Sequence, residues 1–135
     1  MDCIFCKIIA GKIPANIVYQ TSHSIAFLDI SPVNKGHTLV VPKEHYADLY
    51  TLPPKVLYDM IDAVQKVAMA VKKGVTADGI NIGMNNGGAA GQIVFHAHMH
   101  VIPRYSHDGL RHWPAKKYAD GEIKQIEEKI KKELQ

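Results

Sequence analysis

Four short apolar stretches bounded by turn-forming residues predict the strands of a sheet. They cover residues 24–30, 37–41, 80–84 and 94–102. The first two flank residues 31–36, which are rich in turn formers, so we expect those two strands to form an antiparallel pair. Prolines follow the second and fourth stretches directly. Because proline lacks an N–H group, we expect both strands to end there.

Two longer segments carry apolar residues every three or four positions, the period of an amphipathic helix. One covers residues 53–73, and its apolar stripe consists of Val56, Leu57, Met60, Ile61, Val64, Val67, Ala68 and Val71. The other covers residues 121–134, and its stripe consists of Ile123, Ile126, Ile130 and Leu134. Residues 104–119 between strand and helix show no period. Strands beside helices, without regular alternation, predict an α+β fold: an antiparallel sheet with one long helix and a C-terminal helix.

Length and charge narrow the choice of protein class. The 135 residues suit one domain over residues 1–135. A net charge of +3 would weakly attract a small phosphate-bearing molecule but is too small to indicate nucleic-acid binding. The chain contains no apolar run of about 18 residues and no N-terminal signal pattern. We therefore expect a cytoplasmic protein that binds neither a membrane nor nucleic acid.

Three of the eight histidines alternate along the fourth predicted strand. Alternation would place His96, His98 and His100 on one face and the apolar Phe95, Ala97, Met99 and Val101 on the other. Three interpretations are open at this point. The face could be a solvated polar surface, a metal site, or a nucleophilic centre in which neutral imidazole attacks phosphorus.

The segment that contains these histidines resembles a family signature. Residues 96–102, HAHMHVI, resemble the motif His-φ-His-φ-His-φ-φ of the histidine triad (HIT) family, in which φ is apolar. Residues 3–14, 26–32, 36–45 and 91–95 resemble the Hint-like branch of that family in the same order. The resemblance implies a HIT-like fold, a homodimer, and hydrolysis or transfer of nucleoside monophosphoryl groups.

The resemblance assigns catalytic roles to three histidines. It implies that His98 attacks the α-phosphorus of a nucleoside phosphoramidate or dinucleotide polyphosphate and forms a covalent intermediate, from which water releases the nucleoside monophosphate. In the family, a backbone carbonyl holds the other ring nitrogen of the nucleophile. His100 would donate to a phosphate oxygen, and His37 would belong to the proton relay. Without the resemblance, His37 can equally be a histidine at the start of a strand that faces solvent.

The resemblance also implies a site for a purine nucleotide. Asp29 would accept hydrogen bonds from the ribose hydroxyls, although aspartate before Ser31 and Pro32 also commonly caps a turn. Asn85 and Gln92 match phosphate-contacting positions. Five apolar residues match the slot for the base, although their pattern alone would place them in the core: Ile4, Phe5, Ile8, Phe27 and Ile30.

One residue and one short motif match the family less closely. Ile93 departs from the family pattern, in which many Hint-like members have serine near the scissile bond, so the leaving group is left open. His112-Trp113-Pro114 resembles a C-terminal motif whose tryptophan reaches the active site of the partner subunit. The simpler interpretation is that Trp113 packs beneath the irregular segment.

Cys3 and Cys6 have the C-x-x-C spacing of a metal site. A tetrahedral ion needs two more ligands, for which His45 and His96 are candidates. Resemblance to bacterial relatives that keep this motif implies a structural zinc ion on these four residues, with no metal needed for the chemistry. The alternative is a pair of buried free cysteines.

Three function classes remain in competition. The resemblance favours a nucleoside phosphoramidase or dinucleotide polyphosphate hydrolase, because the related uridylyltransferase branch has glutamine where His100 stands. A zinc-dependent hydrolase would instead use His96 and His98 as metal ligands and a bound water as nucleophile. A non-catalytic nucleotide-binding protein would bind the nucleotide without turnover.

Overall fold

The computed structural model describes residues 2–135, and an antiparallel sheet lies at its centre. The five strands run in the order β1-β2-β3-β5-β4. They are β1 (Ile17–Gln20), β2 (Ser24–Leu28), β3 (Thr38–Pro42), β4 (Gly79–Gly83) and β5 (Met99–Arg104). The helices are α1 (Ile4–Ile9), α2 (Pro54–Gly74) and α3 (Glu122–Glu133), with short 3₁₀ turns at Leu49–Thr51 and Gly88–Ala90. The predicted α+β class is confirmed.

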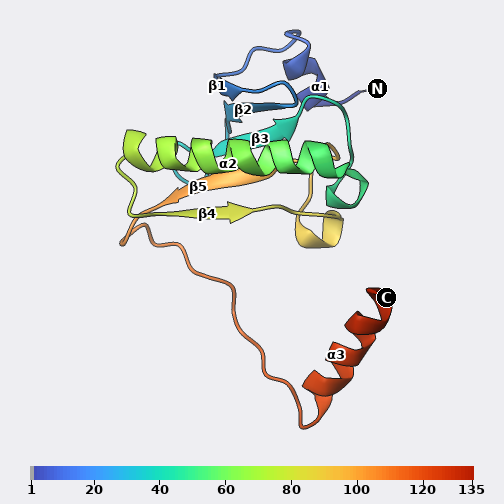
Figure 1. Ribbon diagram of the computed structural model, residues 1–135. Coiled ribbons are helices and arrows are strands. Elements are labelled where there is room, and N and C mark those ends of the chain that lie inside the picture. Colours follow the sequence, from blue (N-terminus) through green and yellow to red (C-terminus); the bar gives the residue numbers. More distant parts are fainter. Residues whose placement is uncertain (1) are drawn as a thin grey trace.

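Helix α2 covers one face of the sheet (Figure 1). It buries Val56, Met60, Ala63, Val64 and Val67 against sheet residues that include Ala26, Val40, Met99 and Val101. On the other face, Phe5 of α1 packs with Ile25, Phe27, Leu39 and Val41. Strands β2 and β3 are therefore buried on both faces, which explains why they appear in the sequence as continuous apolar runs rather than as alternating ones.

The predicted pairing of the first two stretches is confirmed. Strands β2 and β3 pair antiparallel, with Ala26 opposite Val40 and Phe27 opposite Leu39. Strand β1 and helix α1 were not predicted, because each is short and neither shows a clear period. No helix in residues 2–135 combines the length and apolar character needed to cross a bilayer.

The prediction for residues 94–102 is only partly right. The strand begins at Met99, so His96 and His98 precede it. Residues 94–98 leave the sheet because their polar groups bond elsewhere: the Ala97 N–H donates to the Tyr46 carbonyl at 2.7 Å. At the other end, Pro103 does not close the strand but pairs with Ile80 inside it. Proline is tolerated there because β3 pairs with β5 only as far as Val101.

Helix α3 stands apart from the rest of the molecule at the end of an extended segment (Figure 1). The helix itself was predicted, but its apolar stripe is not buried in the chain. Ile123 is 60%, Ile130 57% and Leu134 82% exposed.

Candidate active site and metal centre

His98 is held in one tautomer by the backbone two residues before it. Its Nδ1 lies 2.7 Å from the carbonyl oxygen of His96. A carbonyl oxygen can only accept, so Nδ1 carries the proton and Nε2 keeps its lone pair. The side chain is buried, and the ring of Phe5 stands edge-on to it, with centroids 5.2 Å apart. The structure therefore presents a fixed imidazole with a free nucleophilic nitrogen.

His37 and His100 are joined by a hydrogen bond whose direction can be assigned. The Val33 N–H donates to His37 Nδ1 at 3.1 Å, so the proton of His37 lies on Nε2. That Nε2 is 2.9 Å from His100 Nδ1, which must accept. The proton of His100 is therefore on Nε2. Burial lowers the pKa of His37, and burial together with the neighbouring imidazoles lowers the pKa of His100 to about 4, so both rings are neutral near pH 7.

The Nε2 atom of His100 is a buried donor that finds no hydrogen-bond partner in residues 2–135. The ring centroids of His98 and His100 are 5.0 Å apart. Leaving such a donor unpaired costs free energy, so an oxygen atom supplied by a ligand is the natural partner. A nucleophilic nitrogen and an unpartnered donor thus lie side by side, as attack on a phosphate group requires.

The turn between β2 and β3 places His37 directly before Thr38, the first residue of β3. Gly36 adopts φ +104°, and a Cβ atom there would lie 3.0 Å from Val75 Cγ1. Only glycine allows both the backbone angle and the close approach to the end of α2. His37 is 3% exposed, so the alternative that it faces solvent is wrong.

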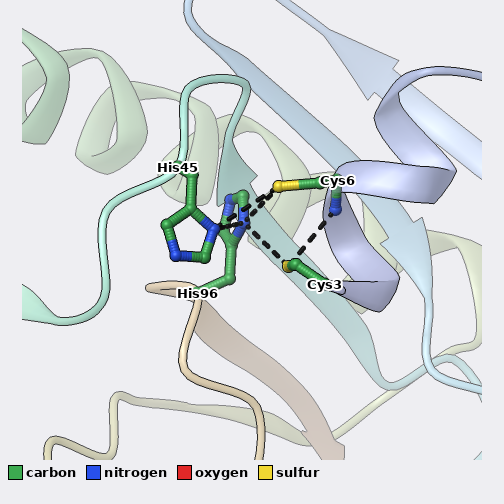
Figure 2. Close-up of side chains that lie close together, drawn as sticks. All are labelled: Cys3, Cys6, His45 and His96. Carbon is green, nitrogen blue, oxygen red and sulfur yellow. Dashed lines mark hydrogen bonds between the residues drawn. The ribbon is translucent and has the colours of Figure 1, made fainter. Parts of the chain in front are cut away.

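Four predicted metal ligands converge on one point beside α1 (Figure 2). His96 Nδ1 lies 3.4 Å from Cys3 Sγ, 3.6 Å from Cys6 Sγ and 3.2 Å from His45 Nδ1. His96 Nε2 donates to the Pro42 carbonyl at 2.8 Å, so the nitrogen that faces the sulfur atoms keeps its lone pair. This arrangement could hold a metal ion.

The chemistry of these four donors also suits a metal. Neutral imidazole and thiolate are the ligands that zinc prefers. Burial raises the pKa of the Cys6 thiol, with a contribution from its hydrogen bond to Cys3, so metal binding at this site would release a proton.

The apolar residues predicted to bind the base are not all in the core. Phe5 and Phe27 are buried and pack edge to face at 5.4 Å, while Ile4 is 46% and Ile30 90% exposed. Ile8 is partly buried beside the same cluster. The expectation from the pattern alone, that all five are core residues, is therefore wrong for Ile4 and Ile30.

Asp29 performs the turn-capping role that the sequence allowed. Its Oδ1 accepts the Ser31 N–H at 2.8 Å. The other oxygen, Oδ2, lies 3.8 Å from His37 Nε2, so the carboxylate borders the pair formed by His37 and His100. A contact with ribose remains a prediction.

The glycine-rich loop is shaped by Gln92. This side chain is 4% exposed; its Nε2 donates to the carbonyls of Ala47 and Val94, and its Oε1 accepts from the Gly87 N–H. All its polar groups are thus bonded to backbone, which indicates that Gln92 sets the course of the loop. Asn85 is freer, with one long contact of 3.5 Å to the Gly91 carbonyl. Phosphate contacts of either residue stay predictions.

A cavity of about 380 Å³ adjoins His37 and His100. Asn85 lines it, together with His112 and Trp113 from the irregular segment after β5. Trp113 is 92% exposed, so it does not pack beneath that segment. The cavity also receives two arginines, Arg104 and Arg111, which the sequence analysis did not select. Arg104 lies four residues after His100 on the same face of β5, so strand alternation could have indicated it. No local pattern marks Arg111, which the path of the segment after β5 brings to the cavity.

Comparison with protein families and curated proteins gives a consistent result. Residues 10–107 match the model of the HIT domain. An uncharacterised HIT-like protein of Methanocaldococcus jannaschii is 55% identical over 79% of this chain and 82% of its own length. An adenosine 5'-monophosphoramidase of Schizosaccharomyces pombe is 40% identical over 99% of both chains. An adenylylsulfatase of Arabidopsis thaliana is 42% identical over 81% of this chain and 55% of its own length.

Solved structures share the fold. A protein of Streptococcus mutans superposes with a TM-score of 0.94 and 42% identity, covering 99% of this chain and 86% of its own. A zinc-bound histidine triad family protein of Mycobacterium smegmatis gives a TM-score of 0.78 and 38% identity, covering 96% of this chain and 98% of its own. Because the family model matches residues 10–107, which include all five strands and the three alternating histidines, this chain belongs to the HIT family.

Proposed function

We propose that this protein is a nucleotide hydrolase that cleaves nucleoside phosphoramidates or dinucleotide polyphosphates at the α-phosphate. One observation carries the proposal. His98 Nδ1 is locked to the His96 carbonyl at 2.7 Å, which leaves Nε2 free beside the unpartnered donor of His100. The names of the S. pombe and A. thaliana relatives support the same class of reaction.

The reaction would proceed in two displacements at phosphorus. His98 Nε2 attacks the α-phosphorus, a P–N bond to the enzyme forms, and the bond to the leaving group breaks with its electron pair going to the departing nitrogen or oxygen. Water then attacks the same phosphorus and the P–N bond breaks. The electron pair of that bond returns to His98 Nε2, which restores the neutral ring, and the attacking water gives its proton to solvent as the nucleoside monophosphate leaves.

His100 and His37 would act on charge rather than as nucleophiles. His100 Nε2–H donates to a phosphate oxygen as negative charge builds up in the transition state. The hydrogen bond from His37 Nε2 to His100 Nδ1 keeps that donor correctly oriented. Protonation of His100 Nδ1 would remove the acceptor of this bond and release the ring, so activity should fall as the pH approaches the His100 pKa of about 4.

The nucleotide itself would lie along the α1 face of the sheet. Phe5, Ile8 and Phe27 belong to one apolar cluster on that face, and Ile4 and Ile30 expose apolar side chains, which suits a purine base. The Oδ2 atom of Asp29 is available to the ribose hydroxyls, and Asn85 lines the cavity beside His100, where a phosphate would lie.

Cys3, Cys6, His45 and His96 would hold a structural zinc ion. A tetrahedral zinc ion with Zn–S of about 2.3 Å and Zn–N of about 2.1 Å spaces its ligand atoms by about 3.4–3.8 Å. The spacings between 3.2 and 3.6 Å around His96 Nδ1 come close to these values. The bound ion would join α1 to the segment that carries His98, and all four ligands come from protein, which leaves no position for a reactive water.

The geometry argues against the zinc-dependent hydrolase. That mechanism needs His98 as a ligand, but the candidate metal-binding groups in residues 2–135 do not include it. The Nδ1 atom of His98 is also occupied by the His96 carbonyl. Zinc at this centre would therefore position the catalytic segment rather than supply the nucleophile.

The chain would act as a homodimer. An isolated helix of the length of α3 is marginal in water, so its exposed apolar stripe calls for a partner surface. Helix α2 also exposes Tyr58 and Ile61, and β4 is an edge strand, so a second copy has complementary surface to cover. Light scattering on the wild type and on Ile130→Glu tests this, with a monomeric wild type as the contrary result.

Release of AMP from adenosine 5'-phosphoramidate tests the main proposal. Wild type should turn over, His98→Ala should be inactive though folded, and a matched His107→Ala variant of an exposed histidine should retain activity. Intact-mass spectrometry should detect an adenylyl adduct on wild type and none on His98→Ala. If His98→Ala binds AMP and wild type shows no turnover, the chain is a nucleotide-binding protein instead.

EDTA in a parallel sample distinguishes covalent catalysis by His98 from metal-dependent hydrolysis. Circular dichroism must be recorded alongside, because chelation can unfold a protein that depends on structural zinc. An unchanged rate in EDTA, with the fold intact, supports covalent catalysis. Loss of activity without loss of fold would support metal-dependent hydrolysis.

A further inference from the structure

Two basic side chains line the cavity beside His100. Arg104 and Arg111 both line it, and no aspartate or glutamate does so in the part of the chain that the structure describes. His37 and His100 line the same cavity. A group that enters this space can meet the guanidinium of Arg111, whereas the guanidinium of Arg104 is paired with Asp108 and the Asp29 carboxylate lies 3.8 Å from His37 Nε2.

The guanidinium of Arg104 already makes hydrogen bonds within the chain through all three of its nitrogen atoms. Its Nε donates to Asp108 Oδ2 at 2.8 Å and its Nη2 to Asp108 Oδ1 at 3.2 Å. Its Nη1 donates to Asn81 Oδ1 at 2.7 Å, and Nη2 also reaches the Leu110 carbonyl at 3.2 Å. These bonds neutralise Arg104 and fix the backbone up to Leu110.

Asp108 also helps to fix the segment that follows β5. Besides Arg104, it accepts from the backbone N–H groups of Tyr105 and Leu110 and from Asn34 Nδ2. The neighbouring guanidinium holds the pKa of Asp108 well below its ordinary value, so this anchor stays charged. The residue that follows the anchored stretch is Arg111.

Arg111 differs from Arg104 because no acidic side chain in residues 2–135 forms an ion pair with it. Among residues 2–135 it makes no ion pair within 4.0 Å, and no side-chain hydrogen bond involves it. A planar guanidinium presents paired donors that match the oxygens of a phosphate or sulfate group. A free guanidinium in the lining of the cavity beside His100 is thus suited to a tetrahedral oxyanion.

We propose that Arg111 binds the leaving group, so that the enzyme favours nucleoside monophosphoryl substrates whose leaving group is a tetrahedral oxyanion. The inference rests on the proposed function and deepens it. When the P–O bond to sulfate or phosphate breaks, the electron pair stays on oxygen and the departing group carries the charge that Arg111 meets. When a P–N bond breaks, the amine must gain a proton and leaves without such a charge.

Comparison of two substrates tests this assignment. For wild type, Arg111→Gln and Arg111→Lys, kcat/KM would be measured with adenylyl sulfate and with adenosine 5'-phosphoramidate. Loss of one charge-assisted contact should lower the ratio of the two kcat/KM values about 10–100-fold in Arg111→Gln. Arg111→Lys should retain part of the ratio. Lys116→Gln, a matched loss of charge outside the cavity lining, should leave it unchanged.

A binding measurement separates this inference from the proposed function. Calorimetry with AMP and ADP compares a nucleotide without and with an additional phosphate in the leaving-group position. ADP should bind wild type more tightly, and Arg111→Gln should lose that advantage, whether or not either substrate turns over. Equal affinity for AMP and ADP in wild type, or an advantage that survives in Arg111→Gln, overturns the assignment. So does an Arg111→Gln variant whose ratio of kcat/KM values matches wild type.

Discussion

Acidification should destabilise the fold through the buried pair of His37 and His100. Burial, together with the nearby imidazoles of His98 and His37, lowers the pKa of His100 to about 4. In the unfolded chain a histidine titrates near 6.5. Below that pH the imidazole of His100 binds a proton in the unfolded state but stays neutral in the folded state. The free energy of unfolding therefore falls as the pH drops from about 6.5 to about 4.

The magnitude follows from the two pKa values. At pH 5 the unfolded imidazole is almost fully protonated and His100 in the fold is not, which corresponds to a loss of up to about 2 kcal/mol relative to pH 7. Burial also lowers the pKa of His37 and His96, which adds destabilisation of the same sign. Substituting His100 by asparagine should remove its share of the pH dependence while leaving the remainder.

Urea denaturation at pH 7 and pH 5 measures this difference. Wild type, His100→Asn and an exposed-site control, His107→Asn, would be compared at one fixed protein concentration, because association also shifts stability. The drop between the two pH values should be smaller in His100→Asn by up to about 2 kcal/mol and unchanged in His107→Asn. An undiminished drop in His100→Asn, or a wild type that gains stability on acidification, would refute the reasoning.

Three further outcomes are expected. Cys6→Ser should abolish stoichiometric zinc, read by plasma mass spectrometry, and lower Tm; retention of one zinc ion per chain would contradict the assigned ligands. Asp59→Ala should cost about 1–3 kcal/mol in urea denaturation, because its Oδ2 accepts the buried Ser24 hydroxyl at 2.6 Å, whereas the exposed Asp62→Ala should change stability by less than about 0.5 kcal/mol. Gln92→Ala should speed amide hydrogen exchange in the glycine-rich loop, and exchange at the wild-type rate would show that its three backbone contacts do not hold the loop.

Local patterns in the sequence predicted much of the fold. The stripe of α2 and the apolar runs of β2 and β3 were identified within two residues of their ends, because a repeat of 3.6 residues or a continuous buried run is visible in a short window. Spacing alone also indicated that Cys3 and Cys6 are candidate ligands, and they do converge with His45 and His96.

Contacts between distant segments decided the details of the active site. Alternation suggested three equivalent histidines on one strand, but the chain leaves the sheet before Met99, and each ring receives a different partner. His96 faces the cysteines, His98 bonds a backbone carbonyl, and His100 meets His37, which lies 63 residues earlier in the chain. The position of each proton depends on these partners, so no period in the sequence could predict it.

The sequence by itself determined which residue types are available and how the main helix and inner strands form, because those depend on neighbours a few positions apart. Only the tertiary structure decided which histidine keeps a free lone pair, which donor is left unpartnered and which arginine is uncommitted. Those properties depend on hydrogen bonds between segments that are distant in the sequence. Asp108, for example, accepts hydrogen bonds from both Arg104 and Asn34, and Asn34 reaches it only after the sheet has formed.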